Sequence, residues 1–245
     1  FLDYVAAAKL DPAQVAEVVT GMAEACRAAG CALLGGETAE MPGVYAPGEV
    51  DVAGTIVGAV DRAAIIDGRR IAAGDAVLGL ASSGPHTNGY SLVHKLVGDR
   101  PLDVFEPALA MSPLDALLMP HRSYLDDVLR LRAEGIDVRG LAHITGGGLI
   151  ENPPRILPPG LAIRLDRQAW AVPPLFRWLA ALGPVAPAEM HRVFNMGLGL
   201  LIVVPAAQAE AALRLLHCPA SIVGRVEPRV EAPVVFDPPL PEKIA

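Results

Sequence analysis

Four glycine-rich segments hold most of the polar side chains that could do chemistry. The first, GGETAEMPG at 35–43, places Glu37 and Glu40 after paired glycines, which let a ligand approach the main chain closely. Carboxylate oxygens of this kind can hold Mg²⁺ together with the oxygens of a phosphate. The alternative interpretation is a tight turn with solvated acids, which paired glycines alone would favour.

The second segment, SSGPHTNG at 82–89, stands directly before a predicted helix. Hydroxyl, imidazole, amide and main-chain donors meet there at a helix N-terminus, which suits a phosphate group. His86 could serve as a general acid or base. A helix start without a ligand needs only one capping residue, so the number of polar groups favours a site.

Two further segments are HITGGG at 143–148 and FNMGLG at 194–199. Three consecutive glycines are costly in chain entropy and a turn needs one or two, so this run predicts close contact between the main chain and a ligand. His143 is either a site residue or an ordinary histidine at the end of a strand, and taken alone it favours the second. The glycines of FNMGLG are also explained by a bulge or by close packing.

The composition excludes several classes of function. The chain has 245 residues, a formal net charge of −7 and 52% hydrophobic residues, which predicts a sizeable core and argues against a nucleic-acid partner. No apolar run is long enough for a membrane span. Cys26, Cys31 and Cys218 lack the spacing of metal ligands and indicate the reduced thiols of a cytosolic protein. No segment matches the Walker A, GxGxxG or GxSxG patterns.

The elements that must position these segments predict an α/β or α+β protein in two parts, with a boundary near 61–70. In the first part, Asp11 and Pro12 begin a helix that ends at Gly30. Strands are expected there at 1–5, 31–34 and 50–60. In the second part we expect strands at 76–81, 141–144, 161–165, 197–204 and 222–226 and helices at 88–96, 123–134, 149–156, 173–182 and 206–216. Residues 99–120 read as irregular, and the Pro-rich tail at 233–241 is expected to wrap the surface.

Five stretches in this order resemble one family, phosphoribosylformylglycinamidine cyclo-ligase or AIR synthetase. They are GGETAEMPG (35–43), DVAG (51–54), SSGPHTNGYSLV (82–93), HITGGGLIENPPRILP (143–158) and FNMGLG (194–199). The resemblance implies a two-domain fold: residues 1–65 would complete an N-terminal ATP-binding and dimerisation domain. Its sheet would pair with that of a second copy into a shared barrel, and residues 66–245 would form a larger α/β domain.

The resemblance also implies a reaction in purine biosynthesis. ATP would phosphorylate the formyl oxygen of formylglycinamidine ribonucleotide, the amidine nitrogen would attack, and phosphate would leave as the imidazole ring closes. The products would be aminoimidazole ribonucleotide, ADP and phosphate. The implied protein is a cytosolic homodimer that uses ATP and Mg²⁺, with a small-molecule substrate and no nucleic-acid or membrane partner.

Carried onto this chain, the resemblance assigns expected roles to individual residues. Glu37 and His86 would be catalytic, and Glu37 would hold the metal. The expected ATP contacts are Gly35, Gly36, Glu37, Thr38 and Asp51. The expected substrate contacts are Ser83, Gly84, His86, Thr87, Asn88, Thr145, Gly146, Gly147, Gly148 and Asn195. The division between ATP and substrate contacts is an inference from the order of the segments.

The family pattern also has a Gly-rich, Asp-bearing nucleotide loop and an Asn-Asp motif upstream of the stretch that matches Phe1. These 245 residues are therefore expected to hold the end of the first domain and all of the second, and a polypeptide that began at Phe1 is expected to lack catalysis. Two alternatives stay open: another ATP-dependent enzyme of the same superfamily, and a truncated paralogue that binds a nucleotide without turnover.

Overall fold

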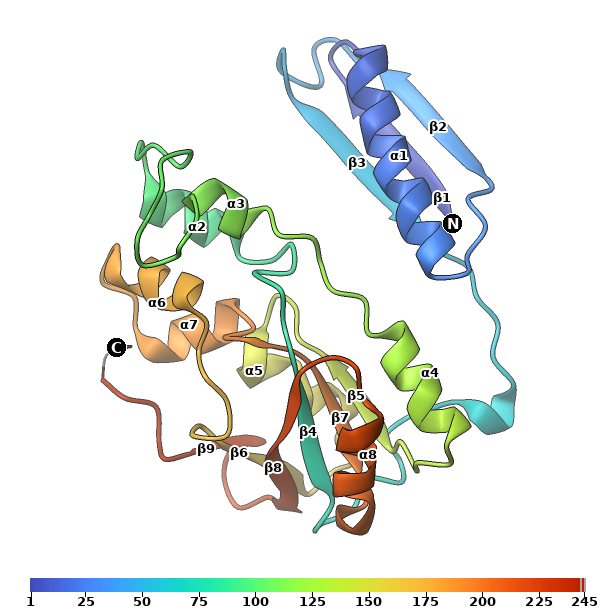
Figure 1. Cartoon of the computed structure of the whole chain (residues 1–245), viewed down its shortest axis with the longest axis vertical. Coiled ribbons are helices and arrows are strands. Elements are labelled where there is room, and N and C mark those ends of the chain that lie inside the picture. The colour runs from blue at the N-terminus through green and yellow to red at the C-terminus, as the bar shows by residue number, and fades with distance from the viewer. Residues whose placement is uncertain (243, 245) are drawn as a thin grey trace. The chain divides into compact units, whose positions relative to one another are not determined.

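The computed structural model describes residues 1–242 and 244, and it divides into two compact units, Phe1–Ile65 and Ile66–Ala245 (Figure 1). Each unit is treated by itself below. Within the described part of the chain, no helix combines the length and the apolar character needed to cross a membrane.

Unit 1 is a three-stranded sheet with one helix. Strand β1 (Leu2–Ala7) lies between β2 (Gly35–Glu40), to which it is parallel, and β3 (Val50–Thr55), to which it is antiparallel. Helix α1 (Pro12–Ala28) crosses one face of this sheet (Figure 1). The predicted helix start is confirmed, because the Asp11 side chain accepts a hydrogen bond from Ala13 N at 2.9 Å.

The prediction for residues 31–40 is wrong in its local structure. The strand expected at 31–34 is not there, and Leu34 is 76% exposed. The expected turn GGETAE is itself strand β2, paired along its length with β1. Gly36 permits this pairing, since a Cβ at that position would lie 2.2 Å from the carbonyl oxygen of Asp3. Gly36 therefore serves the close approach of two strands, whereas a Cβ at Gly35 would meet no atom within 4 Å.

Unit 2 is built on a six-stranded sheet in the order β5-β7-β4-β8-β6-β9. Neighbouring strands are antiparallel except β6 and β9, which are parallel. The expected mixed α/β architecture is confirmed, in its α+β form. The strands are β4 (Ala76–Ala81), β5 (Gly140–His143), β6 (Leu161–Asp166), β7 (Leu198–Val204), β8 (Ala220–Pro228) and β9 (Val234–Asp237).

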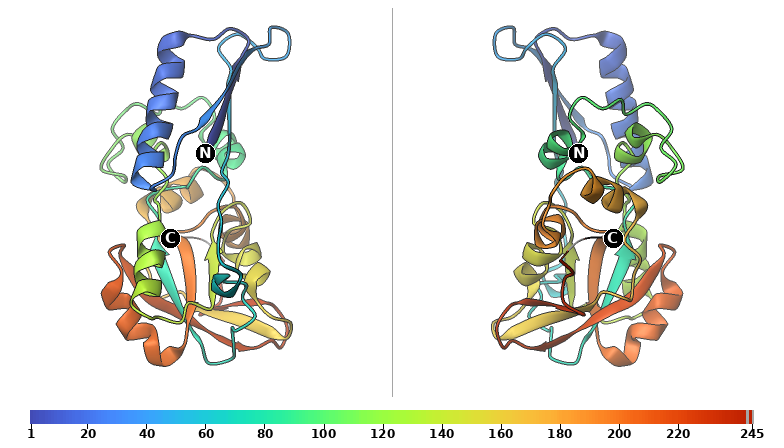
Figure 2. Two further views of the ribbon diagram at one scale, coloured as in Figure 1. Left: turned by 90° about the vertical axis from the view of Figure 1, so that its right-hand side faces the viewer. Right: turned by 90° about the vertical axis from the view of Figure 1, so that its left-hand side faces the viewer.

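Helices cover both faces of this sheet, as the views in Figures 1 and 2 show. Alternate strand residues point to opposite faces, so Val77 joins one core cluster and Leu78 the other. The cluster of Val77 includes residues of α2 (Tyr90–Val97), α3 (Pro113–Leu117), α5 (Gly148–Glu151), α6 (Pro174–Ala181) and α7 (Pro187–Val193). The cluster of Leu78 includes residues of α4 (Leu125–Ala133) and α8 (Ala209–Leu215). Short 3₁₀ turns lie at Arg62–Ala64, Pro153–Ile156 and Ala206–Gln208.

Three short elements were not expected from the sequence. Helix α3 lies in the stretch predicted to be irregular, and it begins where the Ser112 hydroxyl accepts from Asp115 N. Helix α7 begins with Pro187 in its first turn, a position where the missing N–H of proline costs nothing. The tail expected to wrap the surface contains β9, which adds to the edge of the sheet beside β6. All three are too short for a periodic pattern to identify.

The topology brings the predicted site segments together at one end of the strands. Strands β4 and β5 are both antiparallel to β7, so they run in the same direction. Their carboxyl ends lead into 82–89 and 144–148, and the amino end of β7 follows 194–197. Three segments far apart in the sequence therefore meet at that end of the strands.

At the opposite end of the strands, one arginine joins two carboxylates. Arg139 donates to Asp75 Oδ1 at 2.7 Å through Nη1 and to Asp137 Oδ2 at 2.9 Å through Nε. The Asp75 side chain is 6% exposed and also accepts from Ala72 N at 2.9 Å. This contact ties the segment before β5 to the turn that precedes β4.

We expect Arg139→Met to lower the free energy of unfolding by about 1–3 kcal/mol, because the buried Asp75 carboxylate would lose its charged partner. Urea denaturation followed by tryptophan fluorescence measures this, since both tryptophans, Trp170 and Trp178, lie in unit 2. The matched control is Arg192→Met, which breaks the exposed pair with Glu189 and should cost less than about 1 kcal/mol. Equal losses in the two variants would contradict this account.

Candidate functional site

The turn that follows β4 has a strained main chain. His86 and Thr87 have φ of 54° and 59°, and Gly89, the N-cap of α2, has φ of 80°. Positive φ is unusual for any residue with a Cβ and rarest for a β-branched one such as Thr87. Strain of this kind persists where the surroundings hold it in place, and it gathers at functional sites.

The side-chain amide of Asn195 holds the first half of this turn. Asn195 is 2% exposed. Its Nδ2 donates to the carbonyl oxygen of Gly84 at 2.7 Å, and its Oδ1 accepts from Ser82 Oγ and Gly197 N, each at 2.9 Å. The amide thus links the turn to the start of β7. It is expected from the sequence to contact substrate, whereas the structure commits it to protein groups.

Asn88 holds the second half of the turn and joins it to the glycine loop after β5. Its Nδ2 donates to the carbonyl oxygen of His86, and its Oδ1 accepts from Gly146 N at 2.8 Å. The two segments, far apart in the sequence, are therefore in direct contact.

The three glycines of this loop are already engaged within the protein. Gly146 N donates to Asn88, Gly147 N to the carbonyl oxygen of Arg192 at 3.1 Å, and Gly148 N to that of Thr145 at 2.9 Å. Gly148 has φ of 55°, and a Cβ there would lie 2.1 Å from the carbonyl oxygen of His191. The run is explained by close packing, so its amides are not the free phosphate donors that the sequence suggests.

Free donors are found instead in the strained turn. Among the residues that the structure describes, the main-chain N–H groups of Gly84, His86 and Thr87 make no hydrogen bond, and of these residues Thr87 is exposed and Gly84 half-buried, whereas His86 is buried. Adjacent main-chain amides in irregular conformations make concave anion sites. The unbonded amides of Gly84 and Thr87 therefore lie directly before α2, where an anion could accept from them.

His86 is buried beneath this turn and is neutral. It is 1% exposed, and its Nε2 accepts from Ser83 N at 2.9 Å, which leaves the proton on Nδ1 without a partner. Burial, followed by the charges of His121 and His143, lowers the pKa of His86 to about 3. A group with this pKa does not act as an acid at neutral pH, so the structure supports a positioning role for a residue that is expected from the sequence to be catalytic.

Sequence analysis did not identify His121, which stacks on His86. Their ring centroids are 4.1 Å apart with 18° between the planes, and His121 Nε2 lies 3.0 Å from His143 Nε2. Burial lowers the pKa of His121 and that of His143 as well. Ring nitrogens of all three lie within 4.8 Å of one another, but the lone pair on His86 Nε2 already accepts from Ser83 N and is not available to a metal ion. Nothing in the spacing along the chain could have shown that these segments meet.

An apolar cavity of about 590 Å³ opens beside this stack. His121 and His143 line it together with Tyr124 and Leu125 at the start of α4 and with Leu141 on β5. A volume of this size is in the range of small-molecule sites, about 300–1,000 Å³. The cavity could take the uncharged part of a ligand.

Unit 1 carries the acidic residues expected to hold a metal. Glu37 and Glu40 lie three positions apart on β2, so they project from opposite faces and cannot share a cation. Asp51 lies on β3 and accepts from Tyr45 Oη at 2.9 Å. Strand β1 lies between the strands of Asp51 and Glu37, so the Cα atoms of these two residues are about 10 Å apart across the sheet. Gly35, Gly36 and Thr38 are exposed positions of the same strand β2.

Glu37 is therefore one exposed carboxylate, which accepts from Thr38 N at 3.0 Å. A single carboxylate is compatible with Mg²⁺, because this ion is commonly held by one or two carboxylates plus phosphate oxygens.

Comparison with known proteins decides the family. The family described as AIR synthase related protein matches this chain twice, its N-terminal domain at residues 1–60 and its C-terminal domain at residues 72–236. The chain belongs to the AIR synthase related family.

Curated relatives in this family are named phosphoribosylformylglycinamidine cyclo-ligase. The chain is 56% identical to one from Burkholderia mallei (strain SAVP1) over 216 residues, which cover 88% of this chain and 61% of the relative. It is 54% identical to one from Bordetella pertussis over 230 residues, which cover 92% of this chain and 65% of the relative. The chain thus spans less than two thirds of the length of these relatives.

Solved structures share the AIR synthase fold at low sequence identity. The E. coli hydrogenase maturation protein HypE has a TM-score of 0.66 and 22% identity, covering 96% of this chain and 68% of that one. Thiamine-monophosphate kinase from Stenotrophomonas maltophilia has a TM-score of 0.65 and 17% identity, covering 98% and 72%. These likenesses concern the fold alone.

The packing of the glycine loop predicts a sharp difference between two neighbouring substitutions. Gly148→Ala should destabilise unit 2 by at least ~3 kcal/mol, because its Cβ would overlap the carbonyl oxygen of His191 at a positive φ. In Gly146→Ala the nearest atom would be Asn88 Oδ1 at 3.5 Å, an ordinary contact, so the change should stay within about 1 kcal/mol. Urea denaturation compares the two, and similar losses would refute the packing explanation.

The burial of His86 predicts a histidine that does not titrate in the usual range. Its pKa of about 3 lies below the ordinary value of 6.5, so the unfolded chain takes up the proton first as the pH falls. Stability from this group should therefore be complete above pH 6.5 and decrease as the pH falls towards 3. Nitrogen-15 NMR of the imidazoles should show His86 neutral at pH 5 with the proton on Nδ1, and His86→Gln identifies the signal. Titration near 6.5 would contradict the buried placement.

Proposed function

We propose that this protein catalyses the ATP-dependent cyclisation of formylglycinamidine ribonucleotide to aminoimidazole ribonucleotide, with release of ADP and phosphate, in de novo purine biosynthesis. The observation that carries the proposal is the 54–56% identity to proteins of that name over about nine tenths of the chain. Because the chain spans 61–65% of those relatives, the activity is proposed for the protein that contains this sequence. A cytosolic homodimer is part of the same proposal.

The chemistry of this reaction matches what the strained turn offers. Phosphoryl transfer needs the reacting groups to be aligned and the charge on the phosphoryl oxygens to be neutralised, with little covalent help from the protein. The free amides of Gly84 and Thr87 supply fixed donors for a phosphate, and the amino end of α2 favours negative charge there. We assign the substrate phosphate to this turn.

In this proposal three polar side chains hold the phosphate-binding turn in position. Asn195 and Asn88 hold the two halves of the turn, and the neutral His86 accepts from Ser83 N beneath it. Gly146 supports the turn by donating to Asn88, and the loop around it is held by the bond from Thr145 N to Asn152 Oδ1 at 2.6 Å. Fixed donors cost no reorganisation during the reaction, which is the advantage of a rigid anion site.

Glu37 is proposed as the protein ligand for the Mg²⁺ of Mg²⁺–ATP, with Gly35, Gly36, Thr38 and Asp51 as further contacts in unit 1. The exposed carboxylate on β2 supports this, since nothing in the described residues pairs it with a cation. When bound, the ion would neutralise charge on the phosphate oxygens.

A homodimer is supported by the edge of unit 1. Strand β3 pairs with β1 on one side only, and its Val50 and Val52 are 38% and 45% exposed. An exposed apolar edge strand is a template for pairing with another chain. The sheet of a second copy would cover these valines.

The reaction is tested on the purified protein in its natural length, with formylglycinamidine ribonucleotide, ATP and Mg²⁺. Aminoimidazole ribonucleotide and ADP formed in equal amounts support the proposal. ADP formed only with a different acceptor indicates another enzyme of the superfamily, and nucleotide binding without turnover indicates a non-catalytic paralogue. Either of these results would overturn the proposed reaction.

Glu37→Gln should reduce turnover at limiting Mg²⁺ by at least about tenfold, because it removes the charge that we assign to the metal and keeps the size of the side chain. The matched control is Glu40→Gln on the opposite face of the same strand, whose carboxylate accepts from Leu10 N and which should keep normal kinetics. Excess Mg²⁺ should partly restore the Glu37 variant. Unchanged turnover in that variant would contradict the assignment.

A further inference from the structure

A second polar cavity in unit 2 is not explained by the proposed function. Its volume is about 340 Å³, and it shares no residue with the turn at 82–89 or the glycine loop at 145–148. Arg167 and Trp170 after β6, Arg177 on α6 and His191 on α7 line it, together with Met196 and Pro241.

His191 gives this cavity a buried hydrogen-bond acceptor. The residue is 3% exposed, and its Nδ1–H donates to the carbonyl oxygen of Pro187 at 2.8 Å, which leaves a lone pair on Nε2. Within the described residues Nε2 has no hydrogen-bond partner, and it is not sealed from solvent. Phe236 on β9 holds the ring edge-on at 5.2 Å. Burial lowers the pKa of His191, so the ring stays neutral and accepts from an N–H or O–H group.

Two arginines give the cavity positive charge without a carboxylate to balance it. In the described part of the chain Arg177 has no ion pair or hydrogen bond. Arg167 donates only to the main-chain oxygens of Pro239 at 2.6 Å and Pro238 at 3.4 Å. Guanidinium groups arranged in this way suit a phosphate, which they can bind through two parallel hydrogen bonds.

Trp170 gives the cavity a fixed aromatic surface. Its indole N–H donates to the carbonyl oxygen of Met196 at 3.1 Å, so the ring is held and its polar atom is used. Val172 and Met196 add apolar surface beside it. Aromatic side chains held in this way stack on nucleic-acid bases.

We propose that this cavity binds a nucleoside monophosphate. Its phosphate would lie between Arg167 and Arg177, and its base would lie against Trp170. An exocyclic amine or ribose hydroxyl would donate to His191 Nε2. The volume is at the small end of the range for ligand sites, about 300–1,000 Å³, which suits a mononucleotide. The proposal uses no residue of the phosphate-binding turn and does not depend on the proposed reaction.

The test uses the whole chain with Trp178→Phe, which leaves Trp170 as the single tryptophan. Trp178 lies outside the lining of the cavity and donates to Glu106 Oε2 at 3.3 Å. Titration with AMP should change the Trp170 fluorescence in a saturable way. In this background Arg177→Gln should raise the Kd of AMP about tenfold or more, because a charge-assisted contact to the phosphate is lost.

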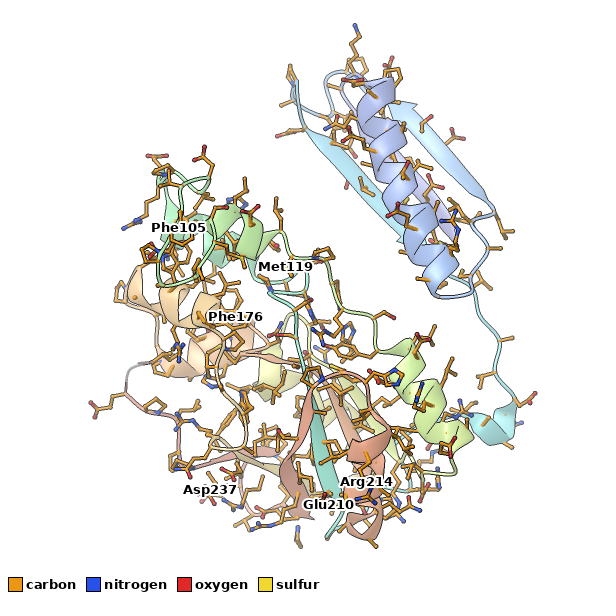
Figure 3. All side chains as sticks on the ribbon, in the orientation of Figure 1. Phe105, Met119, Phe176, Glu210, Arg214 and Asp237 are labelled. Atoms are coloured by element: carbon orange, nitrogen blue, oxygen red, sulfur yellow. The ribbon has the colours of Figure 1, made fainter. Side chains whose placement is uncertain are left out.

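The matched control is Arg214→Gln, an exposed arginine on α8 (Figure 3), whose helix packs on the other face of the sheet and should leave the Kd unchanged. Adenosine and inorganic phosphate, each lacking half of the ligand, should bind at least tenfold more weakly than AMP. No fluorescence change with millimolar AMP, or equal effects of the two arginine substitutions, would overturn the proposal. Inorganic phosphate that binds as tightly as AMP would also overturn it, because the aromatic contact would then contribute nothing.

Discussion

The arrangement of unit 2 around its candidate site depends on one buried side-chain amide, that of Asn195. Its three hydrogen bonds join Ser82 and Gly84 to the start of β7. Buried amides with every partner satisfied rigidify their surroundings, since an unmade hydrogen bond in that position is costly. The strained backbone at His86 and Thr87 can persist because both ends of the turn are held, one by Asn195 and the other by Asn88.

Close packing at two glycines makes this arrangement possible. A Cβ at position 199 on β7 would lie 2.0 Å from Tyr124 Oη and 2.6 Å from His86 Cε1, so His86 can enter the interior only beside a glycine. Gly148 similarly allows the end of α7 to approach the loop after β5. The glycines thus accommodate packing and the side-chain amides of the asparagines hold the turn, which leaves the main-chain amides of Gly84 and Thr87 unbonded.

Local signals in the sequence predicted what depends on neighbouring residues. Asp11 and Pro12 mark the start of α1, and the apolar run at 76–81 is β4, because capping and burial are encoded within a few positions. Gly36 was interpreted as part of a turn, whereas it allows the close approach of β1, which is distant in sequence. The amides of Gly146 and Gly147 were expected to contact a ligand, and their partners, Asn88 and Arg192, lie far along the chain. His121 could not be found at all, since only the fold brings it onto His86.

The central claim is that the turn at 84–87, and not the glycine loop, holds the phosphate of the ligand. Amide chemical-shift mapping with ribose 5-phosphate, the phosphate-bearing part of the proposed substrate, measures this directly on the nitrogen-15-labelled chain. We expect large downfield shifts of the Gly84 and Thr87 amide protons, with those of Gly147 and Gly148 nearly unchanged because they stay bonded to protein carbonyls. Large shifts confined to Gly146, Gly147 and Gly148 would contradict it.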